Sequence, residues 1–436
     1  MTLSSMFGIM VSLVGIRIGG AVLNLAIQIM FARLFIPEDV GIIFLTMSTA
    51  AVFGLAATVG YPWLAQTQLP RFATLGHTKI QRAFHGAFLH DSIRAFSIVC
   101  IFSFSVFFFW PVSPGVQLAL LFGCLAAPAS MLMRYDSAVA SSLKRFSLSY
   151  VPDFLVRPIL LAAYILALNF AGVQVSVVHA LTAFVVCLHI TNALQAKLLG
   201  REGALPSDLK LAKPSLTKAL RPRAVSLAIV AAVATSFADI ITLVAGPLLP
   251  SEELASLAVA VRLAAMAGFV IQVTQQFILP DLTAALTVRD KTSTRHLLLR
   301  FNIMTIATIA AALLGALIFG HWALAAFGPS YALGWPLLIA LMIGQSIRAF
   351  SGMNQQLLSI AGYQAKTAGS CIAAFIALII CSILGVKFFG VIGIGYAVIV
   401  AELIWSLLLA AQAQYLTGSR GDIFWILQQS IKHKSL

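Results

Sequence analysis

The chain has 436 residues, of which 60% are hydrophobic and only 10% are charged, and its mean hydropathy is +0.98. Soluble domains carry about 25% charged residues, so these values exclude a water-soluble globular protein and predict a polytopic membrane protein. The net charge of +14 would suggest nucleic-acid binding in a soluble protein, but here the basic residues lie mainly between apolar runs, and we expect no nucleic-acid partner.

Twelve apolar runs are long enough to be membrane spans. A helix rises about 1.5 Å per residue, so about 20 apolar residues cross the hydrocarbon layer. The predicted spans, in chain order, are 7–32, 41–65, 93–110, 115–133, 154–170, 174–196, 224–248, 254–278, 298–320, 332–350, 367–386 and 390–413. The expected fold class is therefore an all-α integral membrane protein with about 12 transmembrane helices.

The charges of alternate loops predict the orientation of these spans. If the N-terminus is cytoplasmic, 24 of the 28 lysines and arginines fall on the cytoplasmic side, including Arg134, Arg157 and Arg348. This is the distribution that the positive-inside rule requires. The opposite loops are short and contain acidic residues: Glu38, Asp39, Glu252 and Glu253. We expect both termini to be cytoplasmic.

The chain also resembles itself at a shift of 214 residues. This shift aligns two separate pairs of segments, 38–54 with 252–268 and 125–143 with 339–357. The second alignment places Arg134 on Arg348. Because each half has an even number of spans, both halves enter the membrane from the same side, as in a parallel repeat.

This repeat predicts two lobes of six helices each. The most polar and basic stretch of the chain lies between the sixth and seventh spans, which makes it the expected linker. The predicted organisation is an N-lobe over residues 1–200, a basic cytoplasmic linker over 201–223, a C-lobe over 224–413 and a cytoplasmic tail over 414–436.

Four ionisable residues lie at membrane depth: Arg17, Asp239, Arg262 and Glu402. A charge there costs at least about 2.5–3.5 kcal/mol and indicates a functional site. Both arginines are roughly 12–15 Å from the near end of their span, close to the middle of the bilayer. An arginine stays charged and presents a planar fork that matches phosphate oxygens.

Each of these arginines begins a polar face of its helix. Asn24 and Gln28 follow Arg17 at +7 and +11, and Gln272 and Gln276 follow Arg262 at +10 and +14. Two such faces, one from each lobe, predict a hydrated, cationic cavity. The predicted substrate-binding residues are Arg17, Asn24, Gln28, Arg262, Gln272 and Gln276.

The two acids have alternative interpretations. Asp239 and Glu402 could take up and release a proton or a sodium ion, or they could pair permanently with the buried arginines. Both interpretations remain open at the level of sequence, and no other cofactor or metal is expected.

Two segments carry a resemblance to a known family. "FARLFIPEDVGIIFLTMSTAAVFGLAATVG" (31–60) and "GVIGIGYAVIVAELIW" (390–405) resemble segments of polysaccharide and O-antigen flippases. These proteins belong to the multidrug/oligosaccharidyl-lipid/polysaccharide exporter (MOP) superfamily. The resemblance implies a V-shaped bundle around a central cavity and a non-enzymatic function. Arg17 and Arg262 match, by span and depth, the arginines that engage the diphosphate in the related lipid II flippases.

The implied substrate is a polyprenyl-diphosphate-linked oligosaccharide, namely an O-antigen, capsule or exopolysaccharide unit. The resemblance implies its translocation across the bacterial inner membrane by alternating access, by a monomer that contacts membrane lipid and the polysaccharide polymerase machinery. Two alternatives stay open. One is a multidrug/cation antiporter of the same superfamily. The other is a polyprenyl-linked glycosyltransferase or polymerase with Glu38 and Asp39 as catalytic carboxylates.

Overall fold

The structure is a computed structural model that describes residues 3–75, 77–109, 112–201, 214–288, 290–426 and 428. Within these ranges it leaves out the side chains of some helical residues, including those of Arg17 and Gln276. Most of the predicted linker and the end of the predicted tail, residues 202–213 and 429–436, lie outside the description. Every regular element in these ranges is a helix, which confirms the all-α prediction.

The chain divides into two compact units, Met1–Leu243 and Val244–Leu436. The helices of unit 1 are α1 (Leu3–Leu34), α2 (Pro37–Ala57), α3 (Tyr61–Thr74), α4 (Thr78–Phe109), α5 (Pro114–Ser142), α6 (Phe146–Val151), the π-helix η1 (Pro152–Val156), α7 (Arg157–Phe170), α8 (Val177–Arg201) and α9 (Pro214–Ala245). Those of unit 2 are α10 (Ser251–Thr287), α11 (Lys291–Ala325), the 3-10 helix η2 (Pro329–Gly334), α12 (Trp335–Phe350), α13 (Asn354–Ile360), α14 (Gln364–Phe389) and α15 (Ile392–Thr417).

Eleven of the twelve predicted spans fall on a single helix or a helix with its adjoining η segment, whereas the predicted span 41–65 is wrong at its end, because α2 stops at Ala57 and a turn over 58–60 leads into α3. Among the described residues, nine segments are long and apolar enough to cross a membrane, or ten when the two halves of α9 count as one span. The other two predicted spans lie on α1 and α10, which have 32 and 37 residues. The chain is a multi-pass membrane protein.

Local sequence explains where several helices begin and end. Ser113 accepts a hydrogen bond from the amide of Val116 at the start of α5, and Asp290 accepts one from Ser293 at the start of α11. Both are residues that favour the N-cap position. Gly418 stops α15 with a φ of +67°, which a glycine adopts without steric cost.

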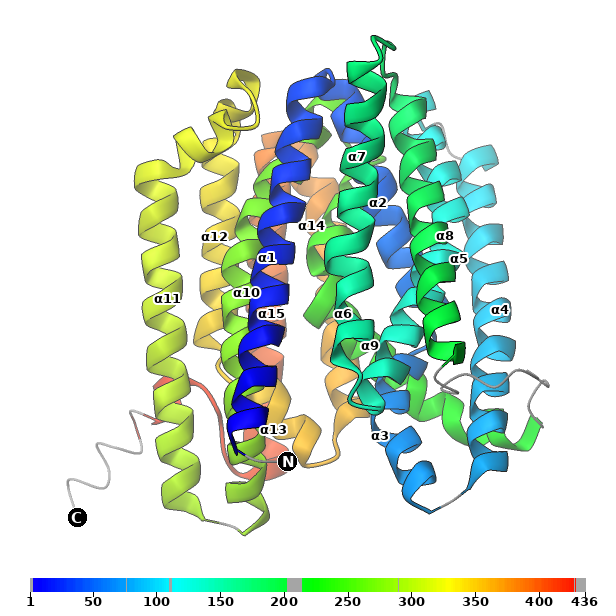
Figure 1. Cartoon of the computed structure of the whole chain (residues 1–436). Helices are drawn as coiled ribbons and strands as arrows, with labels where there is room; N and C mark the ends of the chain where they lie inside the picture. Colours follow the sequence, from blue (N-terminus) through cyan, green and yellow to red (C-terminus); the bar gives the residue numbers. More distant parts are fainter. Residues whose placement is uncertain are drawn as a thin grey trace. The chain divides into compact units, whose positions relative to one another are not determined.

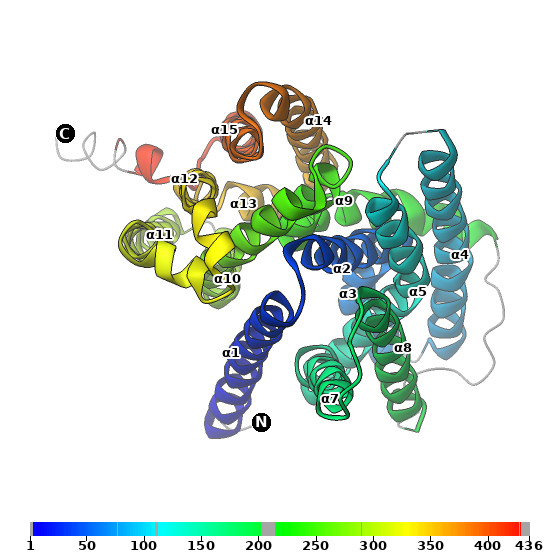
Figure 2. The same cartoon turned by 90° about the horizontal axis from the view of Figure 1, so that it is seen from above.

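Unit 1 is organised around α5, which packs against α2, α3 and α8. Gly54 and Gly123 allow α2 and α5 to approach closely, because a Cβ atom on Gly123 would lie 2.5 Å from Thr49. An aromatic core joins α3, α4 and α5, where the rings of Phe88 and Tyr135 stack at 3.7 Å. Figure 2 shows α4, α5, α7 and α8 of this unit from above.

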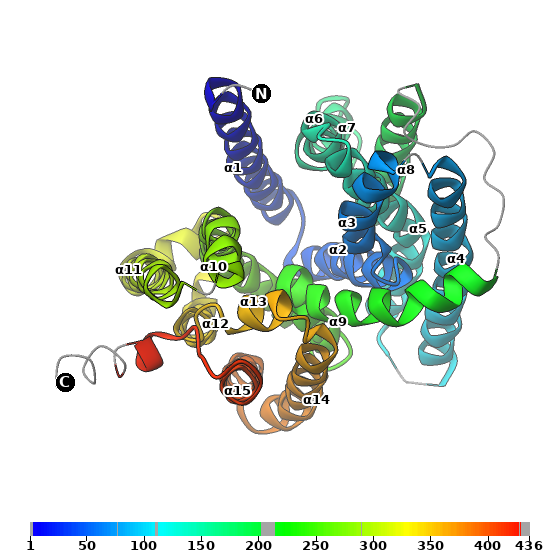
Figure 3. The ribbon, with the colours of Figure 1, turned by 90° about the horizontal axis from the view of Figure 1, so that it is seen from below.

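Helix α9 is not a straight span. Its segments Leu220–Val233 and Thr235–Ala245 meet at an angle of 74°, and Ser236 has a non-helical backbone. The first segment runs across the direction of α4 and α5 (Figures 1 and 3). Gly60, in the turn between α2 and α3, contacts the backbone of Ala224 in this segment. The sequence predicted a span over 224–248 and gave no sign of this bend.

Unit 2 contains a row of neighbouring helices in the order α10, α11, α12, α15 and α14. In the view from above, α11, α12 and α15 are seen nearly end on, so they run roughly parallel (Figure 2). The backbones of α14 and α15 meet at Gly385 and Gly393, where a Cβ atom on Gly385 would lie 2.6 Å from the carbonyl oxygen of Gly393.

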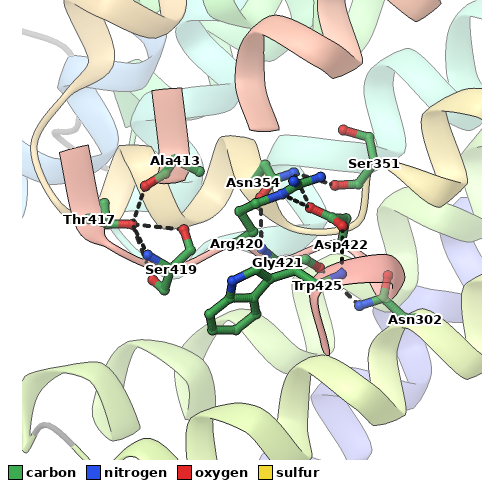
Figure 4. A network of polar contacts seen from close by, with 10 residues as sticks. All are labelled: Asn302, Ser351, Asn354, Ala413, Thr417, Ser419, Arg420, Gly421, Asp422 and Trp425. Carbon is green, nitrogen blue, oxygen red and sulfur yellow. Dashed lines mark hydrogen bonds and ion pairs between the residues drawn. The ribbon is translucent and has the colours of Figure 1, made fainter. Parts of the chain in front are cut away.

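The segment after α15 is bound to unit 2 by a polar network (Figure 4). We call Gly418–Trp425 the C-terminal anchor. Asn302 of α11 donates to the carbonyl of Gly421 at 2.9 Å, and the amide of Gly421 donates to Asn354 of α13 at 2.7 Å. Arg420 donates to Asp422 at 2.7 Å. Part of the predicted tail, 414–436, is thereby packed against α11 and α13.

Three arginines that the sequence predicts on the cytoplasmic side lie within helical segments of the structure. Arg134 is eight residues before the end of α5, Arg157 lies inside the apolar segment Phe146–Phe170, and Arg348 lies in the last turn of α12. The predicted span 115–133 therefore ends too early, whereas the predicted spans 154–170 and 332–350 already include Arg157 and Arg348. Charged groups accompany all three. Asp153 lies one turn before Arg157, whereas Glu402 beside Arg348 and Asp239 near Arg134 come from distant parts of the chain that no local pattern reveals.

Candidate functional site

The predicted polar face of α1 contacts another element of unit 1. Asn24 is half-buried, and its side-chain amide donates to the carbonyl of Gly20 at 2.9 Å. A Cβ atom on Gly20 would lie 2.7 Å from Cβ of Phe154, so α1 packs closely on η1 at this point. Gln28 is also half-buried. Arg17 lies on α1 one turn before Gly20, and its side chain is outside the description.

Next to this contact, unit 1 has a group of charged residues that the sequence analysis did not predict. We call Arg134, Asp153, Arg157 and Asp239 the unit 1 charge cluster. Arg157 pairs with Asp153 across one turn at 3.0 Å. Arg134 of α5 lies within electrostatic range of Asp153 and Asp239, which attract it, and of Arg157, which repels it.

Asp239 has a hydrogen-bond donor as well as this arginine. Ser48 of α2 donates to its carboxylate at 3.0 Å, although the two residues are 191 positions apart. Asp153 lies in a π-helix, an irregular element that is frequent at functional sites. The candidate ion-coupling residue Asp239 is thus one member of a multi-helix polar group in unit 1.

A second polar group lies deeper in unit 1. Asp136 is 4% exposed, and its nearest described donor is the amide of Asn192 at 3.5 Å. Gln195, one turn further along α8, donates to Ser137 at 3.0 Å. Asp136 follows two residues after Arg134, and the sequence analysis treated this part of the chain as the start of a loop. In the sequence, only the prediction of a longer α5 would have indicated that Asp136 lies within a helix.

In unit 2, Arg262 is half-buried near the first third of α10. Its guanidinium donates to the carbonyl of Ala258, one turn earlier, at 3.2 Å. Gln272 is half-buried on the same helix, whereas the side chain of Gln276 is outside the description. Gly268 lies between Arg262 and Gln272 on α10, and it approaches Gln345 of α12 closely.

The other candidate acid of unit 2, Glu402, is paired with an arginine from α12. Its Oε1 lies 3.8 Å from Nη1 of Arg348, and the Glu402 side chain is 1% exposed. The guanidinium of Arg348 stacks over the ring of Trp405 at 5.1 Å. The sequence repeat aligned Arg348 with Arg134, and in the structure each of these arginines interacts with an intramembrane acid of its own unit.

Metal binding finds no support in the described residues. They contain no group of three or more histidine, cysteine, aspartate or glutamate side chains that could hold an ion. All five cysteines are free thiols. What the two units offer instead is arginines and acids within apolar helices.

Comparisons with known proteins bear on what this arrangement does. No protein-family profile matches the chain, and no curated protein sequence is significantly similar to it. Solved structures do match. An inward-facing multidrug resistance MATE family transporter of the MOP superfamily aligns with a TM-score of 0.71 at 14% identity, over 91% of this chain and 94% of its own.

Lipid II flippase MurJ, in an inward closed conformation, aligns with a TM-score of 0.65 at 13% identity, over 97% of this chain and 96% of its own. The chain has the fold of the MOP-superfamily transporters. A eukaryotic MATE transporter adds a TM-score of 0.62 at 15% identity, over 91% and 92% of the two chains. All three are transporters or flippases and none is an enzyme.

Proposed function

We propose that the protein is a flippase that moves a polyprenyl-diphosphate-linked oligosaccharide, such as an O-antigen, capsule or exopolysaccharide unit, across the bacterial inner membrane. The shared fold supports a MOP-type transporter. The proposal includes alternating access, cytoplasmic termini, a monomeric protein in membrane lipid, and a polysaccharide polymerase machinery that receives the flipped unit.

One observation carries this proposal. The two acids that the sequence left available to neutralise Arg17 and Arg262 each have a different arginine beside them: Arg348 for Glu402, and Arg134 for Asp239. With the other charged groups of these segments included, five arginines stand against four acids, an excess of one positive charge: Arg17, Arg134, Arg157, Arg262 and Arg348 against Asp136, Asp153, Asp239 and Glu402. An anionic substrate supplies the matching charge.

We propose that Arg17 and Arg262 bind the diphosphate. Guanidinium forks make charge-assisted, bidentate hydrogen bonds to phosphate oxygens. The polar residues that share their helix faces are proposed to contact the substrate with them: Asn24, Gln28, Gln272 and Gln276.

A multidrug antiporter is an alternative that the fold supports equally, because MATE transporters align as well as the flippase does. The polarity of the binding site distinguishes the two. A MOP-superfamily transporter from Pyrococcus furiosus, with a TM-score of 0.54 at 13% identity over 92% and 94% of the chains, has a binding pocket of reversed polarity that suggests a different function. For the present chain, membrane-depth arginines favour an anion over an organic cation.

The test compares Arg17→Ala and Arg262→Ala in cells whose only flippase is this protein. Each lost charge-assisted contact costs about 1.5–3 kcal/mol, so we expect flipping to fall roughly 10- to 100-fold per variant. Lipid-linked units should accumulate in the inner leaflet, and surface glycan should fall. Matched controls are Arg33→Ala, at the end of α1, and the exposed Arg300→Ala on α11, which should flip normally. Normal flipping by both Arg17→Ala and Arg262→Ala, at wild-type protein levels, contradicts the proposal.

The antiporter alternative makes the opposite forecast in the same strains. Expression should lower the accumulation of cationic drugs, and Asp239→Asn should abolish this effect, since an organic cation needs a carboxylate. Under the flippase proposal, drug accumulation does not respond to expression of either the wild type or Asp239→Asn.

A further inference from the structure

Glu402 is the most completely buried acid among the described membrane-depth residues. It lies near the middle of α15 with 1% of its side chain exposed. Neither carboxyl oxygen has a hydrogen-bond partner among the described residues. Ser406, one turn later on the same helix face, is also buried with an unpartnered hydroxyl. Buried polar atoms normally have partners, so an acid without any requires an explanation.

Few charged or titratable groups face Glu402 from the helices packed on α15. From α12 comes Arg348, whose Nη1 is 3.8 Å from Oε1 of Glu402. From α14 comes the thiol of Cys371, which is within electrostatic range of both residues. The short helix α13 has no titratable side chain. Arg348 is therefore the one charge among these described neighbours that acts strongly on Glu402.

Helices α12 and α15 pack closely next to the two charged groups. One turn before Arg348 lies Gly344, where a Cβ atom would be 3.0 Å from Val398, the residue one turn before Glu402. A Cβ atom on Gly395 would lie 2.7 Å from Ala340, also on α12. At these two glycines, side chains of one helix lie against the backbone of the other. The gap of 3.8 Å is longer than a charge-assisted hydrogen bond, which is about 2.7–2.9 Å.

These facts determine which ion suits the site. An ionised carboxylate without hydrogen bonds is unfavourable in an apolar interior by several kcal/mol, and an arginine beyond hydrogen-bond distance offsets only part of this. A bound proton removes the buried negative charge. A metal cation does not fit, because Arg348 would repel it at short range in a medium of low dielectric constant.

We propose that Glu402 is a proton-binding site that couples transport to the proton gradient, with Arg348 as the opposing charge that favours release of the proton. A proton from water on one side of the membrane adds to a carboxyl oxygen of Glu402. The same oxygen later gives the proton to water on the other side, and no other bond changes. Proton binding at Glu402 is independent of the proposed function. Only the coupling of this proton to transport rests on the proposed function.

The other candidate acid is less suited to this role. Asp239 is only half-buried, it accepts a hydrogen bond from Ser48 at 3.0 Å, and it lies in the field of Arg134. Its ionised form is therefore already stabilised by neighbours. A carboxyl group that exchanges a proton needs its protonated and ionised forms to be close in free energy. The environment of Glu402 provides this.

The first experiment detects the proton directly. Infrared difference spectra of the purified full-length protein are recorded between pH 5 and pH 9, where a protonated carboxyl group has its own C=O band. We expect such a band to appear on acidification of the wild type and to lose intensity in Glu402→Gln, where another buried acid, Asp136, accounts for the remainder. It should remain at full intensity in the control Glu253→Gln, an exposed acid at the start of α10. Circular dichroism verifies that each variant is folded.

The second experiment tests coupling. In cells that depend on this protein for flipping, nigericin is added to collapse the pH gradient. A gradient of one pH unit is worth a factor of about ten per proton. Flipping by the wild type should fall by that order, whereas Glu402→Gln should be slow with or without nigericin.

The outcomes separate the two proposals. A carboxyl band as intense in folded Glu402→Gln as in the wild type, or flipping by Glu402→Gln that is as fast and as sensitive to nigericin as that of the wild type, overturns the proton site. If the band weakens in Glu402→Gln but no lipid-linked oligosaccharide is flipped by the wild type, the proton site stands and the proposed substrate is wrong.

Discussion

Arg221 of α9 forms a two-pronged ion pair with Asp91 of α4, through Nη2 at 2.5 Å and Nε at 3.3 Å. The carboxylate is 2% exposed and also accepts from the hydroxyl of Tyr61 at 2.9 Å. The two charged residues are 130 positions apart. This contact attaches the first half of the bent helix α9 to the spans of unit 1, and it carries the first prediction.

Asp91→Ala should destabilise the protein. The change leaves the buried hydroxyl of Tyr61 without its acceptor, and a lost buried partner costs about 1–3 kcal/mol. Thermal unfolding in detergent measures the effect. Arg223→Ala, an exposed arginine on the same segment of α9, is the control and should be near neutral. Equal melting temperatures for Asp91→Ala and the wild type would show that α9 is held by other contacts.

Two glycines of unit 2 both have a positive φ, but only one of them is in close contact with another segment. Substituting each by alanine therefore distinguishes the cost of the backbone conformation from the cost of the contact. Gly352 has a φ of +64° and its Cα faces the carbonyl of Gly421 in the C-terminal anchor, whereas Gly362 has a φ of +85° with no neighbour within 4 Å. Alanine in this region of φ costs about 1–2 kcal/mol at either site. We expect Gly352→Ala to lose clearly more stability, because its methyl group also displaces the anchor. Similar losses at both positions would mean that the anchor adjusts freely.

Neighbouring glycines on α1 provide a matched pair for the contact with η1. Gly20→Ala places a methyl group 2.7 Å from Phe154, whereas a Cβ atom on Gly19 meets nothing within 4 Å. Alanine is the better helix former by about 1 kcal/mol, so Gly19→Ala should be neutral or stabilising. Gly20→Ala should lower the melting temperature and the flipping rate. A Gly20→Ala protein that behaves like Gly19→Ala would show that α1 does not depend on this close approach.

The unit 1 charge cluster predicts a second-site rescue. Arg134→Ala leaves Asp239 and Asp153 without their nearest α5 cation, and we expect a loss of roughly 2 kcal/mol, below the value for a fully buried pair because Arg134 is only half-buried. Adding Asp239→Asn should restore part of the stability. Lys144→Ala, exposed after the end of α5, is the control. Additive losses in the double variant would argue against an interaction between Arg134 and Asp239.

Much of the fold could be predicted from composition and hydropathy. Because lipid leaves backbone hydrogen bonds unsatisfied outside helices, each long apolar run had to be helical, and every predicted span except 41–65, which a turn at 58–60 interrupts, follows one continuous helical segment. The same reasoning could not foresee the bend at Ser236 or the extension of α5 past Arg134, since both depend on contacts with distant residues.

The candidate site was predicted less completely. Glu402 and Asp239 stood out because a charge inside an apolar run is visible in the sequence. Their neighbours Arg348 and Arg134 did not, because arginines near the end of a run look like loop residues. The alignment of these two arginines by the internal repeat was the one sequence signal that set them apart.

The sequence by itself determined that this chain is a helical membrane protein with a basic excess and charges at membrane depth, because these properties follow from the order of polar and apolar residues. Only the tertiary structure decided which charges meet. Glu402 and Arg348 are 54 positions apart, and Ser48 and Asp239 are 191 apart. Such pairs form because close helix packing brings separate faces together, and packing is a property of the folded chain as a whole.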